Sequence, residues 1–348
     1  MRSFTLLALL SILGVFCALS RADDQTTNPL KDNSPNCSCY IINGGNDTAY
    51  FKYHRFWDFR SLTPDHLTSD AWNADWSIQS WNTSASSDAP LQRINLVENV
   101  GILTSDDSNI TALTLNTFRN NSHTQFTAEI QSIQQNIKHA SIRFHARVIG
   151  RNGSEASKGA CAGLFTFADD DNESDIEILT QDPMGTIRYT NQPSLSASGN
   201  EIPQSSITST QLPPVSIFHT HRIDWLAHAT HWFLDASLVA SSMYSVPRKP
   251  SGIFMNLWGD GGVWTGEMAQ GGSAVLVVEW VEAVFNTSGP VAGRAEGCEV
   301  VCRVDGVREV GWPEVVKTGR SVNHGFKRGM GRERGSSQGR SGKLNSND

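Results

Sequence analysis

After residue 19 the sequence has no apolar run long enough to span a membrane, the run at 4–19 is itself short for a span, and no fixed-period repeat is visible. The first absence predicts that the mature protein does not cross a bilayer, and the second excludes an array of repeated units. Basic residues are also outnumbered, because 28 Lys and Arg stand against 35 Asp and Glu for a net charge of −7. We therefore expect no membrane span and no nucleic-acid partner.

The N-terminus is typical of a secretory signal at residues 1–22. Arg2 precedes an apolar run at 4–19, and small residues follow up to Ala22, so cleavage is expected after Ala22 or after Ser20. This signal predicts a secreted glycoprotein, located outside the cell or in the cell wall. Eight Asn-x-Ser/Thr sequons agree with that route, at Asn36, Asn46, Asn82, Asn109, Asn120, Asn152, Asn172 and Asn286. Asn172 is expected to stay unmodified because it directly precedes a cluster of acidic residues.

Two polar segments flank the remaining chain. Residues 23–36 form a polar leader, and residues 317–348 form a basic tail with eight Lys and Arg against Glu333 and Asp348. Such composition is typical of disorder. The tail either adheres to anionic wall polymers or is an inert extension. Residues 37–316 are long enough for one large all-β domain.

Cysteine is scarce, with five residues left after removal of the signal. Cys37 and Cys39 lie near one end of the domain, and Cys298 and Cys302 lie near the other. In an oxidising compartment this arrangement predicts two disulfides between the pairs, with the pairing left open. A zinc site made by the same four residues is the alternative. Cys161 is the odd one, and we expect a buried free thiol.

Short β-like runs alternate with turn residues and predict a β-sandwich. Residues 127–138, which are rich in Gln, are the one predicted helix. Residues 61–92 are predicted to be a long surface segment, whose Trp72, Trp76 and Trp81 either stack on sugar rings or fill gaps in the core. The predicted strands cover residues 94–103, 111–118, 141–149, 162–167, 174–180, 218–226, 232–234, 251–257 and 274–285.

The most informative stretch is Glu173-Ser174-Asp175-Ile176-Glu177. On a strand, alternate side chains share a face, so the three acids line one face while Ser174 and Ile176 line the other. This pattern predicts a strand with its back in a core and its front in a polar cleft. The Cα atoms of Glu173 and Glu177 would lie about 13 Å apart. Their side chains could lean together toward the separation of about 5–5.5 Å that retaining glycosidases use.

Other candidate sites are less specific. His219 and His221 would share a strand face, where a metal site is one interpretation and a polar cleft lining or structural histidines are the other. The turn at 168–172 could hold a structural calcium or be a solvated hairpin turn. The glycine-rich loop at 258–268 could present Trp264 to a sugar or fold it inward.

Together these residues resemble glycoside hydrolase family 16. ESDIE at 173–177 is similar to that family's active-site signature in its form without a β-bulge residue. FHTHRIDW at 218–225, HWFLD at 231–235 and NLW at 256–258 resemble the family's strands and follow its order. The cysteines at both ends and Asp58-Phe59-Arg60 resemble a secreted fungal-type subgroup. The resemblance covers about residues 37–316.

This resemblance implies an all-β fold, a β-jelly roll sandwich of two antiparallel sheets with a concave substrate cleft. It implies Glu173 as nucleophile, Glu177 as general acid/base and Asp175 as the helper between them. Candidate substrate contacts are Trp264, Asn256, Trp258 and His219.

The expected function is retaining, endo-acting hydrolysis of a β-1,3- or β-1,3/1,4-glucan by a monomer that needs no cofactor. A wall glucan transglycosylase and a non-catalytic lectin-like protein are the alternatives. Retention of all three acids argues against the lectin.

Overall fold

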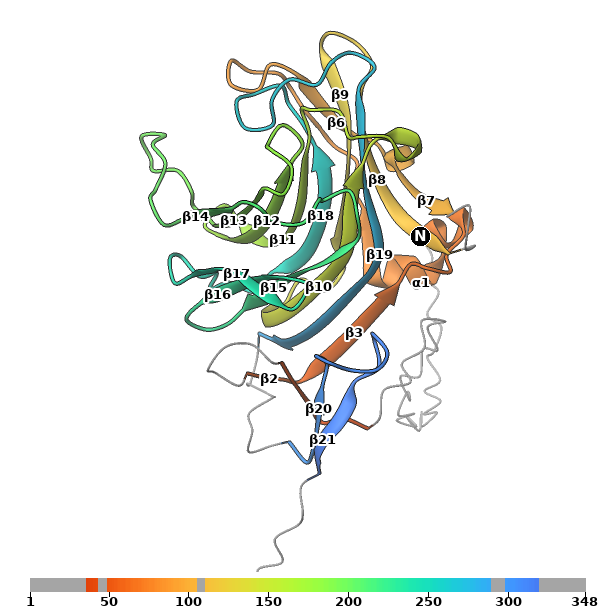
Figure 1. Cartoon of the computed structure of the whole chain (residues 1–348), viewed down its shortest axis with the longest axis vertical. Helices are drawn as coiled ribbons and strands as arrows, with labels where there is room; N and C mark the ends of the chain where they lie inside the picture. Colours follow the sequence, from red (N-terminus) through yellow and green to blue (C-terminus); the bar gives the residue numbers. More distant parts are fainter. Residues whose placement is uncertain (1–35, 43–48, 105–109, 289–297, 319–348) are drawn as a thin grey trace, which may run out of the picture.

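Figure 1 shows the computed structural model, which describes residues 36–42, 49–104, 110–288 and 298–318. The predicted signal peptide, nearly all of the predicted leader and the predicted tail from residue 319 onward lie outside these ranges. Strands make up most of the described chain. The helical pieces are short: α1 (Asp70–Asp75) and the 3-10 turns η1 (Pro64–Thr68), η2 (Val97–Asn99) and η3 (Arg151–Gly153). None of the helices in the described ranges has the length and apolar character that crossing a bilayer requires.

One curved antiparallel sheet, called sheet 1 here, has the order β14-β13-β12-β11-β18-β9-β4 (Figure 1). Its central strands alternate apolar and polar side chains, and this period of two makes a sheet with one buried face. Its strands are β4 (Trp76–Ile78), β9 (Thr124–Ser132), β11 (Cys161–Asp169), β12 (Asn172–Leu179), β13 (Ile187–Asn191), β14 (Ser206–Ser209) and β18 (Gly252–Trp258).

A second set of strands, sheet 2, packs against the buried face of sheet 1. Its central strands run in the order β17-β16-β15-β10-β19, and β19 also pairs with β3 and β8. Strand β9 joins the two sheets by pairing with β8 and, in parallel, with β6. The remaining strands are β3 (Tyr53–Asp58), β5 (Asn82–Thr83), β6 (Gln92–Asn95), β7 (Val100–Thr104), β8 (Thr111–Arg119), β10 (Ile137–Ile149), β15 (His219–Trp225), β16 (Thr230–Leu234), β17 (Ser237–Ser242) and β19 (Ser273–Thr287).

The core lies between the two sheets. Ile176 and Ile178 from β12 belong to the same buried cluster as Ile142 and Phe144 from β10 and Ile223 from β15. Burying these side chains between two layers is the main source of stability in such a sandwich. The predicted all-β sandwich is therefore confirmed.

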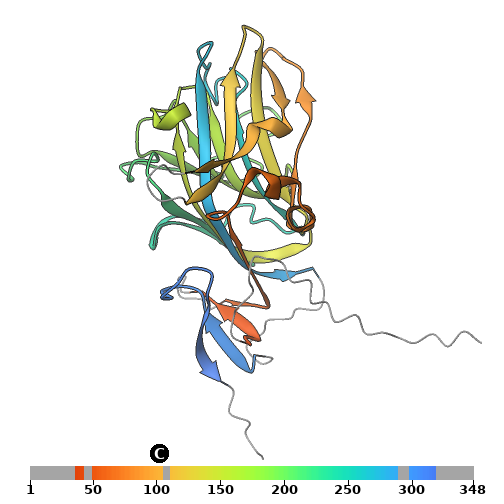
Figure 2. The same cartoon turned by 90° about the vertical axis from the view of Figure 1, so that its right-hand side faces the viewer.

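A small terminal sheet lies below the two large ones (Figure 2). Its order is β2-β1-β20-β21, built from β1 (Cys39–Ile41), β2 (Tyr50–Phe51), β20 (Val300–Arg303) and β21 (Glu314–Thr318). The two predicted disulfides are present and join the segments of β1 and β20: Cys37 bonds to Cys302, and Cys39 bonds to Cys298. The four cysteines are thus used as disulfides and not as a zinc site. Cys161 is free and buried, as predicted.

Buried ion pairs attach this terminal region to sheet 2. Arg143 and Arg222 are directly paired across β10 and β15, which puts two like charges side by side in a buried place. Asp305 from the terminal region bonds to both, at 2.7 Å from Arg143 and 3.1 Å from Arg222. Asp224 adds two bonds of 2.6 Å to Arg222. Glu282 of β19 is a further acid at 3.9 Å from Arg143, whereas Asp305 is the acid that hydrogen-bonds to both guanidinium groups.

Replacing Asp305 with Ala is expected to destabilise the fold by about 3 kcal/mol, because it removes the carboxylate that hydrogen-bonds to the two buried guanidinium groups. The measurement is chemical denaturation of the oxidised protein. Glu309→Ala is the matched control, because Glu309 is an exposed acid in the same terminal region. A loss for Asp305→Ala no larger than for Glu309→Ala would contradict the prediction.

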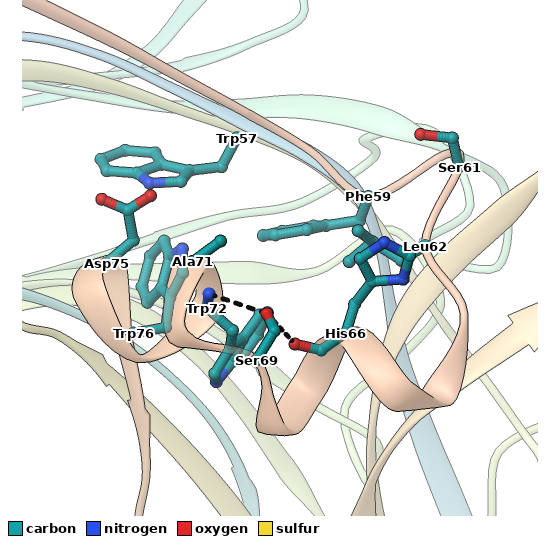
Figure 3. Close-up of a pocket in the computed structure, with 10 residues that line it drawn as sticks. All are labelled: Trp57, Phe59, Ser61, Leu62, His66, Ser69, Ala71, Trp72, Asp75 and Trp76. Carbon is teal, nitrogen blue, oxygen red and sulfur yellow. Dashed lines mark hydrogen bonds between the residues drawn. The ribbon is translucent and has the colours of Figure 1, made fainter. Parts of the chain in front are cut away.

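Two local predictions are wrong. Residues 127–138 form no helix: they contain the end of β9, a turn and the start of β10. The segment 61–92 is not simply a surface loop either, since it contains η1, α1, β4 and β5. Trp72 and Trp76 pack into the core there and line an apolar cavity of about 80 Å³ (Figure 3). For these two Trp residues the core-filling interpretation is the right one.

Candidate active site

The three acids lie together on one face of β12, as their alternation predicts. Ser174, Ile176 and Ile178 point into the core with exposures of 1% or less. Asp175 is almost fully buried, whereas Glu173 and Glu177 are partly exposed on the opposite face. We call this side of sheet 1 the acid face. The register between β11 and β12 is regular from residue 173 to residue 179, so no bulge interrupts the acidic sequence.

Neighbouring strands place further side chains in line with Glu177. In register, Glu177 lies beside Gly163 of β11, Gly163 beside Asn256 of β18, and Asn256 beside Glu129 of β9. A Cβ atom at residue 163 would lie 2.6 Å from Oδ1 of Asn256, so a larger residue there would displace the Asn256 side chain. A glycine therefore lets Asn256 occupy the space next to Glu177.

Burial raises the pKa values of both Glu173 and Asp175, and it affects Asp175 more strongly. Burial raises the pKa of Asp175 well above its usual range, and the nearby Glu173 and Glu177 raise it further. Asp175 thus keeps its proton and donates it in a hydrogen bond to Glu173. Burial also raises the pKa of Glu173, to about 7, while the bond from Asp175 acts in the opposite direction. Asp175 is thus favoured in its neutral form, and Glu173 becomes the anion as pH rises through about 7. Gln192 supports Asp175 through a 3.3 Å bond from Nε2 to Oδ2.

Glu177 has different neighbours. Burial raises its pKa, and hydrogen bonds from Trp264 and Cys161 act against that rise, as does the charge of Arg188. The Nε1 atom of Trp264 lies 3.1 Å from Oε1 of Glu177. Arg188 packs on the Trp264 ring at 4.7 Å and is held by two bonds to Asp182, at 2.8 and 3.0 Å. Glu177 therefore accepts from two donors, Trp264 and Cys161, and lies near the positive charge of Arg188.

A cluster of aromatic and polar side chains extends the acid face on the other side of Asn256. The guanidinium of Arg93 lies between the rings of Trp81 and Trp258, at 5.5 and 5.0 Å. Glu129 accepts hydrogen bonds of 3.3 Å from Trp81 Nε1 and from Asn256 Nδ2. Indole faces suit the C–H faces of sugar rings, and carboxylate and amide groups suit hydroxyl groups. We call these five residues the flanking cluster.

Three of the four predicted substrate contacts lie on the acid face, namely Asn256, Trp258 and Trp264. His219 does not. His219 and His221 share a face of β15, as predicted, but their register partners Ala146 and Phe144 belong to the core, so both rings point between the sheets. His219 Nδ1 is 2.9 Å from Asp235 Oδ2. Burial lowers the pKa of His221 to about 3, which keeps that ring neutral.

No group of three or more metal-binding side chains occurs within the described ranges. At the turn before β12, the carboxylate of Asp169 bonds to the amide of Asn172 at 2.8 Å and to Lys249 at 2.7 Å. The carbonyl oxygen of the Asn172 side chain accepts from the backbone N–H groups of Arg248 and Lys249. Both ends of the Asn172 side chain are engaged, which leaves it poorly placed to carry a glycan.

Sequence reasoning missed Glu129, Arg93 and the contact between Cys161 and Glu177. Glu129 falls inside the segment that was predicted to be a helix, which hid its place in the sheet. The signal that could have found it is a period of two in residues 126–130, where Ala128 and Ile130 are buried and Glu129 is not. Arg93 and Cys161 carry no comparable local signal.

A jelly roll with three clustered carboxyl groups and a flanking aromatic cluster defines a glycosyl-active enzyme. The model of the glycosyl hydrolases family 16 matches residues 92–282, which is more than half of the chain. The protein belongs to that family.

Solved structures show the same fold at low sequence identity. The β-glucanase of Bacillus licheniformis is 16% identical over 66% of this chain and 97% of its own, with a TM-score of 0.51. The endo-β-1,3-glucanase of Pyrococcus furiosus is 16% identical over 71% and 99%, with a TM-score of 0.51. A family 16 protein of Bacteroides ovatus, in complex with a mixed-linkage glucan product, is 14% identical over 66% and 99%, with a TM-score of 0.50. A comparison with curated proteins returned no match.

Proposed function

We propose that the protein is a retaining, endo-acting glycosidase that cleaves β-1,3- or β-1,3/1,4-glucan by double displacement. The observation that supports this most strongly is the division of labour on β12. A buried, protonated Asp175 bonds to Glu173, and two partly exposed carboxyl groups stand on either side of it. A nucleophile that is anionic at the working pH and a separate acid that is able to deliver a proton are what such a reaction needs.

In the proposed first half-reaction, Glu173 attacks the anomeric carbon while Glu177 gives its proton to the departing glycosidic oxygen. The bond between the anomeric carbon and that oxygen breaks, and a glycosyl ester on Glu173 forms. Glu177, now a carboxylate, takes a proton from the incoming water, whose oxygen attacks the anomeric carbon and releases Glu173. Both steps use carboxyl groups alone, so the proposed reaction needs no cofactor.

The flanking cluster supports a glucan as the substrate. Trp81 and Trp258 offer indole rings, and Glu129 and Asn256 offer groups that bind equatorial hydroxyls. The structurally similar proteins include β-glucanases and a protein bound to a mixed-linkage glucan product. A glucan chain lying across the strands would contact this cluster on one side of Glu177 and Trp264 on the other.

A cell-wall glucan transglycosylase is the second candidate. The uninterrupted register of β12 is compatible with it, because the form of the acidic signature without a bulge residue also occurs in transferases of this family. Its first half-reaction is the same, and a sugar hydroxyl replaces water in the second. A lectin-like role has less support, because all three carboxyl groups are retained in an arrangement that fits catalysis.

A panel of soluble β-1,3-, mixed β-1,3/1,4- and β-1,4-glucans tests the proposal, with linkage analysis of the products and β-1,4-xylan as the control polymer. The proposal expects new reducing ends from the first or second glucan. The same reaction with a labelled acceptor oligosaccharide separates the candidates, since faster growth of the acceptor than release of reducing ends selects the transglycosylase. Binding without turnover of any glucan would support the lectin and overturn the enzyme.

We further propose that the protein acts outside the cell as a monomeric glycoprotein of the secreted, disulfide-linked subgroup it resembles. The two disulfides support an oxidising compartment. Four sequons, at Asn36, Asn82, Asn120 and Asn152, are exposed on the described surface. Asn286 is not available in the same way, because its amide bonds to the backbone of Lys52 and of Tyr50.

A further inference from the structure

Two hydrogen-bond donors converge on a single oxygen of Glu177. Trp264 Nε1 lies 3.1 Å from Oε1, and the thiol sulfur of Cys161 lies 3.6 Å from the same atom. Within the described part of the chain, the other oxygen, Oε2, has no hydrogen-bond partner. The two oxygens of this carboxyl group are therefore not equivalent.

The first donor, Cys161, is positioned by strand β11, which pairs with β12. Cys161 begins β11, two residues before Gly163, so its side chain shares the acid face with Gly163, the register partner of Glu177. Its exposure is 0%. Burial raises the pKa of the thiol well above its usual range, and the charge of Glu177 raises it further. Cys161 thus stays a protonated thiol, which is the form that can donate.

The second donor, Trp264, is positioned by a loop that lies beside the acid face. Trp264 belongs to the loop between β18 and β19, which is stabilised by hydrogen bonds inside the loop and by hydrogen bonds from a residue outside it. Asp260 Oδ1 accepts bonds of 2.9 Å from the backbone N–H of Gly262 and from the hydroxyl of Thr265. Gln181 donates from its side-chain amide to the carbonyl oxygens of Val263 and Trp264. These hydrogen bonds fix the loop backbone around Trp264 and so orient the indole N–H toward Glu177.

The charged groups around Glu177 do not provide a substitute for these donors. Arg188 of β13 lies beside it in register, but its guanidinium is engaged with Asp182. The titratable neighbours on its own strand, Asp175 and Glu173, are acids. Cys161 of β11 and Trp264 are thus the groups that bond directly to the carboxyl group.

Building on the acid/base role proposed for Glu177, we propose that Cys161 and Trp264 are positioning residues. By occupying Oε1 they make Oε2 the oxygen that carries the proton transferred to the glycosidic oxygen. A carboxyl group whose proton can sit on either oxygen delivers it in the right direction only part of the time, and two fixed donors remove that ambiguity. They also stabilise the carboxylate that remains after proton transfer.

The test is a direct titration of Glu177 by carbon NMR of protein labelled at the glutamate side-chain carboxyl carbons, with Glu177→Gln used to assign the signal. Removing a donor to a carboxylate raises its pKa. We expect Cys161→Ala to raise the pKa of Glu177 by about 0.5 and Trp264→Phe to raise it by about 1. Cys161→Ser, which keeps a donor, should return the value to the wild-type value or below. Val263→Ala is the control, because it alters an exposed side chain of the same loop.

Activity on a glucan supplies the second readout. In Cys161→Ala and Trp264→Phe the alkaline limb of the pH profile of kcat/KM should move to higher pH by the same amount as the pKa. In Cys161→Ala, which alters no proposed substrate contact, kcat should also be lowered more than KM is changed. An unchanged or lowered pKa of Glu177 in both variants would overturn the positioning role, whatever the activity. A raised pKa in a protein that cleaves no glucan would leave the positioning role supported and overturn the proposed function instead.

Discussion

Replacing Glu173 with Gln is expected to lower kcat/KM on the best glucan substrate by at least about 10⁴-fold, since removal of a nucleophile costs that much or more in enzymes that form covalent intermediates. The amide is nearly isosteric with the carboxyl group and cannot form the glycosyl ester. Release of reducing ends, with each variant assayed near its optimal pH, is the measurement. Glu98→Gln, which alters an exposed acid in η2, should keep full activity.

The stability of Glu173→Gln provides the control for folding, and its sign follows from the pKa. The folded-state pKa of Glu173 is about 7, above its ordinary value of 4.5. The uncharged form of Glu173 is buried at little cost at low pH. The contribution of Glu173 to the stability of the fold then falls as pH rises from 4.5 through about 7. Glutamine carries no such charge, so the variant should gain stability over the wild type at pH 8 and not at pH 4. A variant that is inactive and also less stable at both values would show damage to the fold, and the nucleophile would then have to be tested with Glu173→Asp.

Replacing Glu177 with Ala is expected to lower cleavage of glucan by about 10²–10⁴-fold, which is the usual contribution of a general acid. The loss should depend on the leaving group. A β-glucoside oligosaccharide with an activated aryl group needs no proton from the enzyme, so its first step should stay fast and the glycosyl-enzyme should accumulate. Added azide, a small nucleophile that needs no general base, should then restore turnover and give a β-glycosyl azide.

This pattern distinguishes the role of Glu177 from the role of Glu173. In the Glu173 variant neither an activated substrate nor azide should restore the double displacement. Equal losses for polymer and activated substrate in Glu177→Ala would contradict an acid role, as would formation of an α-glycosyl azide.

The acidic strand could be predicted from sequence because its information is local. Glu173, Asp175 and Glu177 alternate with Ser174 and Ile176, and an alternation of this kind has one stable placement when one side of a strand is buried. The disulfide partners were also foreseen as two pairs at the chain ends. Their pairing depended on β1 lying parallel to β20, and no local pattern contains that contact.

The flanking cluster shows where local reasoning stops. Glu129 reaches the acid face because β9 pairs with β18, and Asn256 because β18 pairs with β11. Both pairings join residues that are far apart in sequence. Gln131, Gln134 and Gln135 favour helix by intrinsic propensity, but the sheet provides backbone partners and burial that outweigh a preference of a few tenths of a kcal/mol per residue.

The prediction that His219 contacts the substrate is wrong for a related reason. Alternation correctly put His219 and His221 on one face of a strand, but it cannot say which face is the core. Their partners on β10, Ala146 and Phe144, settle the question and lie about 75 residues away in the sequence. The same limit applies to Cys161, whose contact with Glu177 arises from the register of β11 on β12.

Trapping the covalent intermediate tests the central claim most directly. A glucan oligosaccharide with fluorine at C2 and an activated leaving group at the anomeric carbon slows the second half-reaction and leaves the glycosyl group on the nucleophile, whether water or a sugar is the natural acceptor. We predict a single added glycosyl group in the intact mass of the protein, located on Glu173 by peptide mass spectrometry. A label on Glu177, or none from a protein that turns over the unfluorinated analogue, would contradict the proposed division of roles.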